Sequence, residues 1–98
     1  MNSKHYVVAY DVTNTRRRNR LARWLLNFAY RVQYSVFEMK ADVPTMKVVV
    51  DGIKRHVNKD EDSVIIYELD ADDWRKKILL GLRTKEREFY EQEYTILG

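Results

Sequence analysis

Apolar and polar positions alternate in a way that divides the first 70 residues into short apolar runs and amphipathic stretches. The first run, Tyr6-Val-Val-Ala-Tyr10, is unbroken and stops at Asp11. A continuous apolar run of this length is typical of a strand buried on both faces, so we predict a strand over residues 5–12. Because a charge is costly inside such a strand, Asp11 is expected at its end, where the chain emerges.

Residues 14–30 predict an amphipathic helix. Its apolar positions follow the i, i+3, i+4, i+7 spacing, and they are Leu21, Trp24, Leu25 and Phe28. Three arginines fall on the opposite face, and they are Arg16, Arg20 and Arg23. Arg17 and Arg18 fall in the first turn, where cations oppose the helix macrodipole, and this placement favours a functional role for them. Asp11, Thr13 or Asn14 is expected to cap the helix unless Asp11 has a chemical role.

The middle of the chain predicts two further strands and a second helix. Residues 31–40 are extended in pattern, with a slip in the alternation between Tyr34 and Phe37 that indicates a kink, a bulge or a break into two strands. Asp42 is expected to cap the second helix, with Pro44 in its first turn. The apolar stripe of that helix is Met46, Val50, Ile53 and Val57. A polar turn at 58–61, a buried strand at 62–69 and a loop at 70–73 follow.

The order of these elements predicts an α+β fold. Strand, helix, strand, helix and strand, joined by right-handed crossovers, favour a ferredoxin-like open sandwich of the βαββαβ type with both helices on one face. We predict a single domain over residues 1–98, with a core at about 5–69 and a dimerisation segment at about 70–98. Within that segment, residues 78–80 fit a short strand or part of a helix, and residues 94–97 are apolar without an evident place in a monomer core.

Composition narrows the classes of function. The chain has 98 residues and is 45% hydrophobic, enough for one small domain. It has no cysteine, which excludes a disulfide framework and a thiolate zinc site and fits a cytoplasmic location. No apolar run approaches the roughly 18 residues of a membrane span, so no membrane partner is expected. The net charge is only +3, but residues 16–31 hold six arginines and no acid, which favours a polyanionic partner.

Four sequence blocks together resemble a known family. They are Tyr10-Asp11, Arg16-Arg-Arg-Asn-Arg20-Leu-Ala, Arg31-Val-Gln-Tyr-Ser-Val-Phe-Glu38 and Asp62-Ser-Val-Ile-Ile-Tyr67. Over about residues 5–69 the chain resembles the small CRISPR-associated endoribonuclease family, the second protein of the spacer-acquisition pair. The block that begins at Arg31 is the most specific. Many members have a glycine just before that arginine, where this chain has Ala29-Tyr30, and the tail after Asp70 matches no pattern of the family.

The resemblance implies a homodimer with a divalent cation, Mg²⁺, shared between the Asp11 residues of two protomers, which makes Asp11 the catalytic and metal-binding residue. It implies nucleic-acid contacts from Arg18, Arg20 and Arg31, to which the first-turn position adds Arg17. Tyr10 and Phe37 match supporting positions of the family. A C-terminal strand, from residues 78–82 or 94–97, is expected to add to the partner's sheet at the dimer interface.

Physical chemistry supports part of this expectation. One carboxylate is a poor site for Mg²⁺, which keeps several waters and favours more than one anionic ligand, and a two-fold axis would supply the second Asp11. Water activated by the metal could then attack a phosphodiester, with Arg18 or Arg31 stabilising the developing charge. No general base is evident, because His5 and His56 occupy positions typical of surface or packing residues.

Three functions remain open. The first is a structural subunit of the spacer integration complex, a homodimer that binds duplex DNA and bridges the CRISPR integrase subunit, with metal-dependent endonuclease activity in addition. The second is a metal-dependent endoribonuclease or duplex DNA nuclease acting on its own, and the third is a toxin-like ribonuclease of the same fold. One acid, no base and many arginines favour the first, because phosphate contacts position a duplex without reading its sequence.

Overall fold

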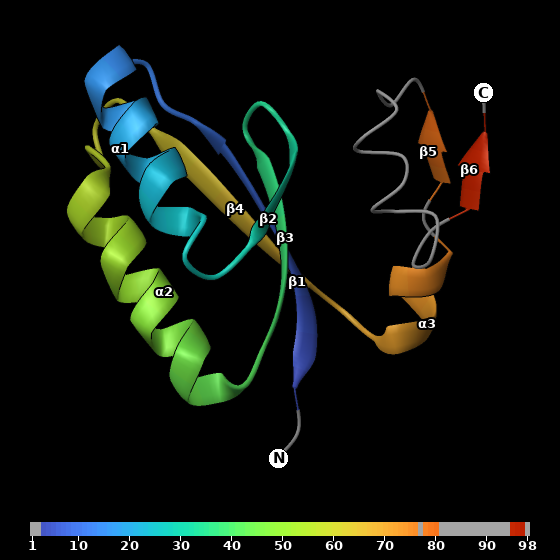
Figure 1. Ribbon diagram of the computed structural model, residues 1–98. Coiled ribbons are helices and arrows are strands. Elements are labelled where there is room, and N and C mark those ends of the chain that lie inside the picture. Colours follow the sequence, from blue (N-terminus) through green and yellow to red (C-terminus); the bar gives the residue numbers. More distant parts are fainter. Residues whose placement is uncertain (1–2, 77, 81–94, 98) are drawn as a thin grey trace. The chain divides into compact units, whose positions relative to one another are not determined.

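The computed structural model describes residues 3–76, 78–80 and 95–97, and the chain divides into two units, residues 1–68 and 69–98. The elements of the first unit and the strand that leads out of it are β1 (Lys4–Asp11), α1 (Thr15–Leu25), β2 (Tyr30–Gln33), β3 (Val36–Ala41), α2 (Val43–His56) and β4 (Ser63–Leu69). The sheet order is β2-β3-β1-β4, with β3 antiparallel to β1 and to β2. Both helices lie on one side of the sheet (Figure 1). This is the predicted α+β ferredoxin-like sandwich.

Strand β1 runs through the centre of the sheet but is buried on one face only. Tyr6, Val8 and Tyr10 are buried beneath the helices, whereas the intervening Val7 and Ala9 are partly exposed on the other face. The prediction of a strand buried on both faces is therefore wrong. An unbroken apolar run cannot distinguish a covered face from an apolar face that is left open in one chain. Asp11 is the last residue of β1, as predicted.

Helix α1 is shorter than predicted, because it ends at Leu25 rather than near residue 30. The apolar periodicity continues through Phe28, which packs against the core from the turn after the helix, so the spacing overstates the helix length. Leu21 and Leu25 are fully buried in the core. The Trp24 ring lies so close to Gly52 of α2 that a Cβ at that position would be 2.0 Å from the ring. A glycine therefore allows the two helices to approach each other.

The slip in the alternation near Tyr34 marks a break into two strands. β2 ends at Gln33 and β3 begins at Val36, with a register shift in their pairing between Arg31 and Gln33. The backbone N–H of Tyr10 donates to the carbonyl of Ser35 at 3.1 Å. The turn between β2 and β3 is thus hydrogen-bonded to the end of β1, directly beside Asp11.

Helix α2 begins as the sequence predicts. The Asp42 side chain accepts a hydrogen bond from the backbone N–H of Thr45, and Pro44 lies in the first turn. Contact with Thr45 lowers the pKa of the Asp42 carboxyl. The core also includes Val49, which the predicted stripe omitted. His56 packs on the Trp24 ring with its Nδ1 at 2.7 Å from the Gly52 carbonyl, so it is a packing residue.

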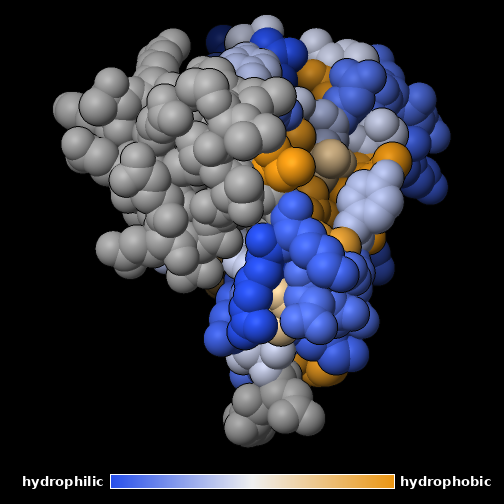
Figure 2. Space-filling view, turned by 90° about the vertical axis from the view of Figure 1, so that its right-hand side faces the viewer, coloured by the Kyte–Doolittle hydropathy of each residue, from blue (hydrophilic) through white to orange (hydrophobic). Residues whose placement is uncertain are grey.

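Strand β4 is an edge strand, not the buried strand that its apolar sequence predicted. Val64 and Ile66 pack against the core, but Ile65 and Tyr67 are 52% and 53% exposed. These two side chains alternate with the core residues and so face away from the helices. On the surface that Figure 2 draws in colour, hydrophobic residues lie among hydrophilic ones. The apolar pattern therefore reports an open sheet face as well as a core.

The second unit contains α3 (Ala71–Arg75), β5 (Ile78–Leu80) and β6 (Thr95–Leu97). Asp70 caps α3 by accepting from the backbone N–H of Asp73, so the predicted loop at 70–73 is instead a helix start. β5 and β6 pair in parallel as a two-stranded sheet. Residues 81–94, which include part of the predicted 78–82 segment, lie outside the described residues. Among the described helices, none has the length and apolar character needed to cross a membrane.

Candidate nucleic-acid interface and metal ligand

Asp11 stands exposed at the end of β1, and the helix that follows does not use it as a cap. Asn14 is the cap, because its side chain accepts a hydrogen bond from the backbone N–H of Arg17 at 3.0 Å. Capping was the simpler explanation for a carboxylate at this point of the sequence. With Asn14 in that role, Asp11 retains an exposed carboxylate that is available to a ligand.

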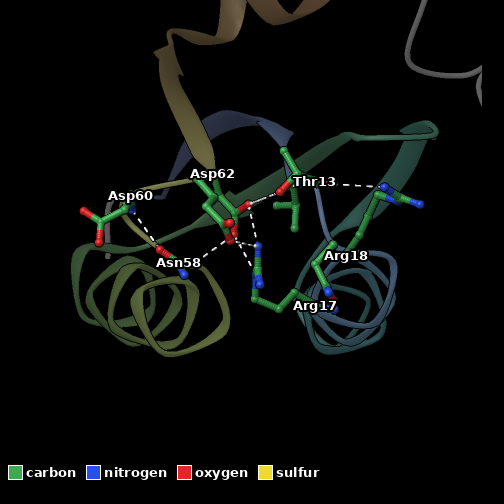
Figure 3. Close-up of polar contacts among 9 residues, drawn as sticks. Thr13, Arg17, Arg18, Asn58, Asp60 and Asp62 are labelled. Carbon is green, nitrogen blue, oxygen red and sulfur yellow. Dashed lines mark hydrogen bonds and ion pairs between the residues drawn. The ribbon is translucent and has the colours of Figure 1, made fainter.

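A second acid, Asp62, lies beside the loop that follows Asp11 (Figure 3). Its side chain is fully buried and accepts hydrogen bonds from the backbone N–H groups of Thr13 and Asn58, at 3.1 and 2.8 Å. Arg17 donates to it from Nε at 2.9 Å and from Nη2 at 3.0 Å, and also reaches Glu61 at 3.2 Å. We call Thr13, Arg17, Asn58 and Asp62 the Asp62 cluster. It joins the loop after β1 to the loop before β4.

The chemistry of the Asp62 cluster is structural. The Arg17 guanidinium holds the pKa of the Asp62 carboxyl well below its usual range, with help from the backbone donors and against the effect of burial. A carboxylate that already accepts from three residues has little capacity left for a metal. Arg17 was predicted to contact nucleic acid, and the structure places its guanidinium in this ion pair. That predicted role stays a prediction.

Arg18 points away from Arg17 (Figure 3). It contacts Tyr34 in the turn between β2 and β3, which Arg31 also contacts. Arg18 donates from Nε to the Tyr34 hydroxyl at 3.1 Å and from Nη1 to the Val12 carbonyl at 3.1 Å. Arg31 donates from Nε to the Tyr34 carbonyl at 3.0 Å and from Nη2 to the same oxygen. The two guanidinium carbons lie 5.6 and 5.0 Å from the Tyr34 ring centroid. We call Arg18, Arg31 and Tyr34 the Tyr34 cluster.

Tyr10 and Phe37, the two predicted supporting residues, lie beneath this cluster. Their rings stack with centroids 6.0 Å apart, and the Arg31 guanidinium lies 5.6 Å from the Phe37 centroid. The buried Tyr10 hydroxyl has no hydrogen-bond partner among the described residues. Burial raises the pKa of Tyr10, and the positive charge of Arg31 opposes that shift. The two rings thus form an apolar floor under Arg31.

Arg20 lies on a basic groove rather than in either cluster. The groove has a volume of about 560 Å³, and it is lined by Arg16, Asn19, Arg20, Ala22, Arg23, Leu26 and Arg31. The exposed face of α1, where three of these arginines were predicted to lie together, therefore continues onto Arg31 of β2. Of the four residues predicted to contact nucleic acid, Arg20 lines this groove and Arg18 lies in the Tyr34 cluster. Arg31 belongs to both.

The predicted metal site is incomplete within one chain. Among the residues that the structure describes, no three His, Cys, Asp or Glu side chains gather closely enough to hold a metal ion. Asp11 offers one exposed carboxylate, which fits half of the predicted shared site. The metal-binding role of Asp11 therefore stays a prediction that depends on a second protomer.

Sequence reasoning missed two residues, Asp62 and Tyr34. Asp62 is separated from Arg17 by 45 positions, and no local pattern reveals such a pairing. A polar turn followed by an acid at the start of a predicted strand was the only available signal. Tyr34 stood at the slip in the alternation, where it was assigned to β-structure rather than to an interaction with the neighbouring arginines.

Comparison with known proteins identifies the family to which this chain is similar. The family model described as CRISPR associated protein Cas2 matches residues 4–77. CRISPR-associated endoribonuclease Cas2 1 of Thermodesulfovibrio yellowstonii is 34% identical over 94 residues, which cover 95% of this chain and 96% of that protein. A hypothetical protein from Thermus thermophilus has a similar structure, with a TM-score of 0.75 and 30% identity over 83% of this chain and 94% of that one.

A chain of a partial Cas6-RT-Cas1–Cas2 complex is also similar, with a TM-score of 0.63 and 32% identity over 72% of this chain and 78% of that one. The family model extends from β1 through α3. It thus includes Asp11, the basic groove, and both side-chain clusters. The chain therefore belongs to the CRISPR-associated protein Cas2 family.

Proposed function

We propose that this chain is a cytoplasmic CRISPR adaptation protein, a homodimer that binds duplex DNA as the structural subunit of a spacer integration complex. The observation that carries the proposal is the basic surface of Arg18, Arg20 and Arg31, which groups cations from α1 and β2 close to the end of β1. The similar chain in a complex that contains Cas1 supports an integrase of the Cas1 type as the partner.

The basic surface suits a duplex of any sequence. Guanidinium groups bind phosphate oxygens, and such contacts fix the position of a duplex without reading its bases. A protein that must accept any captured fragment needs this kind of contact. The groove of about 560 Å³ is lined by four arginines, and cations along one surface suit the phosphate backbone, which a duplex of any sequence presents.

A homodimer is supported by two features. Ile65 and Tyr67 expose apolar surface on the sheet face away from the helices, which a second copy could cover. Asp11 supplies one carboxylate per chain, whereas a magnesium site favours two. The predicted C-terminal strand exchange belongs to the same proposal, with β5 and β6 as the candidate segments.

A magnesium-dependent nuclease activity is the second candidate function. It is favoured by the name endoribonuclease given to the relative in Thermodesulfovibrio and by the exposed Asp11 carboxylate, which capping does not explain. Mg²⁺ held by the two Asp11 carboxylates of a dimer would supply Lewis-acid activation of water. Arg18 and Arg31 are placed to stabilise charge that develops on a phosphate oxygen.

Replacing Asp11 by Ala separates the two functions. We expect Asp11→Ala to abolish magnesium-dependent cleavage of RNA or duplex DNA, because it removes the carboxylate from both halves of the site. The change leaves the arginines in place, so duplex binding and the dimer mass in light scattering should persist. Asp51→Ala, which removes an exposed acid from α2, is the matched control.

Three outcomes are informative. If spacer acquisition in cells survives Asp11→Ala while cleavage is lost, the structural role is supported. If acquisition and cleavage fall together in a variant that still dimerises and binds duplex, the nuclease role is supported. Strong magnesium-dependent cleavage by pure Asp11→Ala protein would exclude Asp11 as the active-site residue, and a monomer at micromolar concentration would exclude the shared site.

A further inference from the structure

Tyr34 is the common contact of two arginines that come from different elements. Arg18 lies in the first turn of α1, and Arg31 lies in β2. Tyr34 presents three separate groups to them, namely its hydroxyl to Arg18, its carbonyl to Arg31 and its ring to both. One residue of a short turn therefore fixes two cations that the sequence places 13 positions apart.

Two like charges do not approach one another without a compensating interaction. Both guanidinium carbons lie within 5.6 Å of the same ring centroid, where the ring quadrupole attracts each of them. The Tyr34 hydroxyl also accepts a hydrogen bond from Nε of Arg18, and the Tyr34 carbonyl accepts one from Nε of Arg31. The arginine side chains thereby lose rotamer freedom before any ligand arrives, which lowers the entropic cost of binding.

We propose that Tyr34 is a positioning residue that holds Arg18 and Arg31 as a paired clamp for one phosphodiester of the bound nucleic acid. This inference rests on the proposed function, because the clamp needs a phosphate ligand. Guanidinium groups bind phosphate through parallel N–H donors, and Arg18 uses three hydrogen bonds on protein oxygens while it has five such donors. An anion between two cations also relieves their mutual repulsion.

The exposed ring offers an alternative role for Tyr34. Tyr34 is 62% exposed, and an exposed aromatic ring can stack on a nucleobase of the bound strand. The two roles differ in their use of the hydroxyl. Stacking needs only the ring, whereas positioning of Arg18 needs the hydroxyl that accepts from its Nε. Arg31 is held by the backbone carbonyl, so a change in the Tyr34 side chain leaves those bonds in place.

Removal of the hydroxyl alone tests the proposal. For the full-length protein and a short blunt-ended DNA duplex of mixed sequence, we expect Tyr34→Phe to raise Kd by about threefold to tenfold, the usual weight of one hydrogen bond. The slope of log K against log salt should stay unchanged, because no cation is lost. Ser3→Ala, which removes an exposed hydroxyl just before β1, is the matched control and should bind as the wild type does.

A double-mutant cycle with Arg18 completes the test. We expect Arg18→Ala to lower the salt slope by about one unit for each phosphate that this side chain neutralises, and Tyr34→Phe to have no further effect in that background. A second loss of affinity from Tyr34→Phe in the Arg18→Ala protein would overturn the proposal. So would wild-type binding by Tyr34→Phe together with weak binding by Tyr34→Ala, which is the pattern of base stacking.

The same measurements separate this proposal from the proposed function. If Arg18→Ala and Arg31→Ala both bind duplex as the wild type does, the assignment of the nucleic-acid surface is wrong. The proposed clamp is then rejected as well. If the arginine variants bind weakly but Tyr34→Phe does not, the surface stands and only the positioning role of Tyr34 is rejected. Equal melting temperatures for Tyr34→Phe and the Ser3→Ala control would show that the loss of affinity does not come from unfolding.

Discussion

Arg17 and Arg18 are neighbours in the sequence, yet their side chains enter clusters of opposite character. In the Asp62 cluster, a fully buried carboxylate is matched with donors from three residues, Arg17 among them. In the Tyr34 cluster, two cations meet around a neutral ring and neutral oxygens. No acid among the described residues forms an ion pair with Arg18. The carboxylate partner ties Arg17 to the fold, whereas Arg18, which donates to neutral oxygens, suits a polyanionic ligand.

The contacts of Arg17 and Arg18 also explain why two cations are tolerated at the start of α1. Two arginines in the first turn of α1 oppose the helix macrodipole, which is unfavourable for an isolated helix. The Asp62 carboxylate offsets this effect for Arg17, and the Val12 carbonyl does so for Arg18. Tertiary contacts thus outweigh the local preference, as is usual for propensities of this size.

The largest expected effect is on stability, from the loss of the buried carboxylate. Asp62→Ala leaves the N–H groups of Thr13 and Asn58 and the guanidinium of Arg17 without their acceptor, so we expect the melting temperature to fall by several degrees or more. Thermal unfolding followed by circular dichroism measures this. Asp60→Ala is the matched control, because Asp60 donates to Asn58 only through its backbone. Equal melting temperatures for the two variants would contradict a structural role for the Asp62 cluster.

The next effect is a separation of stability from binding between the two adjacent arginines. Arg17→Ala should lower the melting temperature and leave the salt slope of duplex binding nearly unchanged. Arg18→Ala should lower that slope by about one unit for each phosphate that Arg18 neutralises, with a smaller effect on melting. Melting curves and a salt titration of duplex binding give both readouts. A reduced slope for Arg17→Ala would instead support the sequence-based expectation that Arg17 contacts nucleic acid.

The smallest effect is a pH dependence that comes from Asp62. Because its pKa is lower in the folded than in the unfolded chain, its contribution to stability is complete above the unfolded value of about 3.9 and is lost as the pH falls through the folded value. The difference in melting temperature between the wild type and Asp62→Asn should therefore narrow in acid. The pKa of the Asp42 carboxyl is also lowered in the folded chain, so Asp42→Asn is the variant to compare with Asp62→Asn. If the difference in melting temperature between the wild type and Asp62→Asn stays constant down to strong acid, this pH dependence is wrong.

Local chemistry explains which parts of the fold could be predicted from the sequence. Asp42 and Pro44 mark the start of α2, and the slip near Tyr34 marks the break between β2 and β3, because each signal acts within a few residues. Asp11 was placed at a strand end because a charge is excluded from a buried strand. Each of these inferences depends on the neighbouring sequence alone.

Most of the inaccurate predictions involve information that is not local. The apolar spacing continues through Phe28 and so predicted too long a helix α1. A residue in a turn can fill the same core position as a residue in a helix. Asp62 pairs across 45 positions, and only the arrangement of the sheet brings it to Arg17. The cap at Asp70 was mistaken for a loop because acids are common in both settings. Arg18 was singled out as a candidate contact for nucleic acid, but its neighbour in the structure, Tyr34, was not.

The short turn at Tyr34 and Ser35 has a consequence for how far the length of this connection can vary. Loops on protein surfaces usually tolerate insertions, because few contacts depend on their backbone. Here the carbonyl of Tyr34 accepts from Arg31 and the carbonyl of Ser35 accepts from the N–H of Tyr10. An added residue would displace one acceptor or the other, and would detach the turn from the strand that ends in Asp11. This turn is therefore a place where the chain should not tolerate a change in its number of residues.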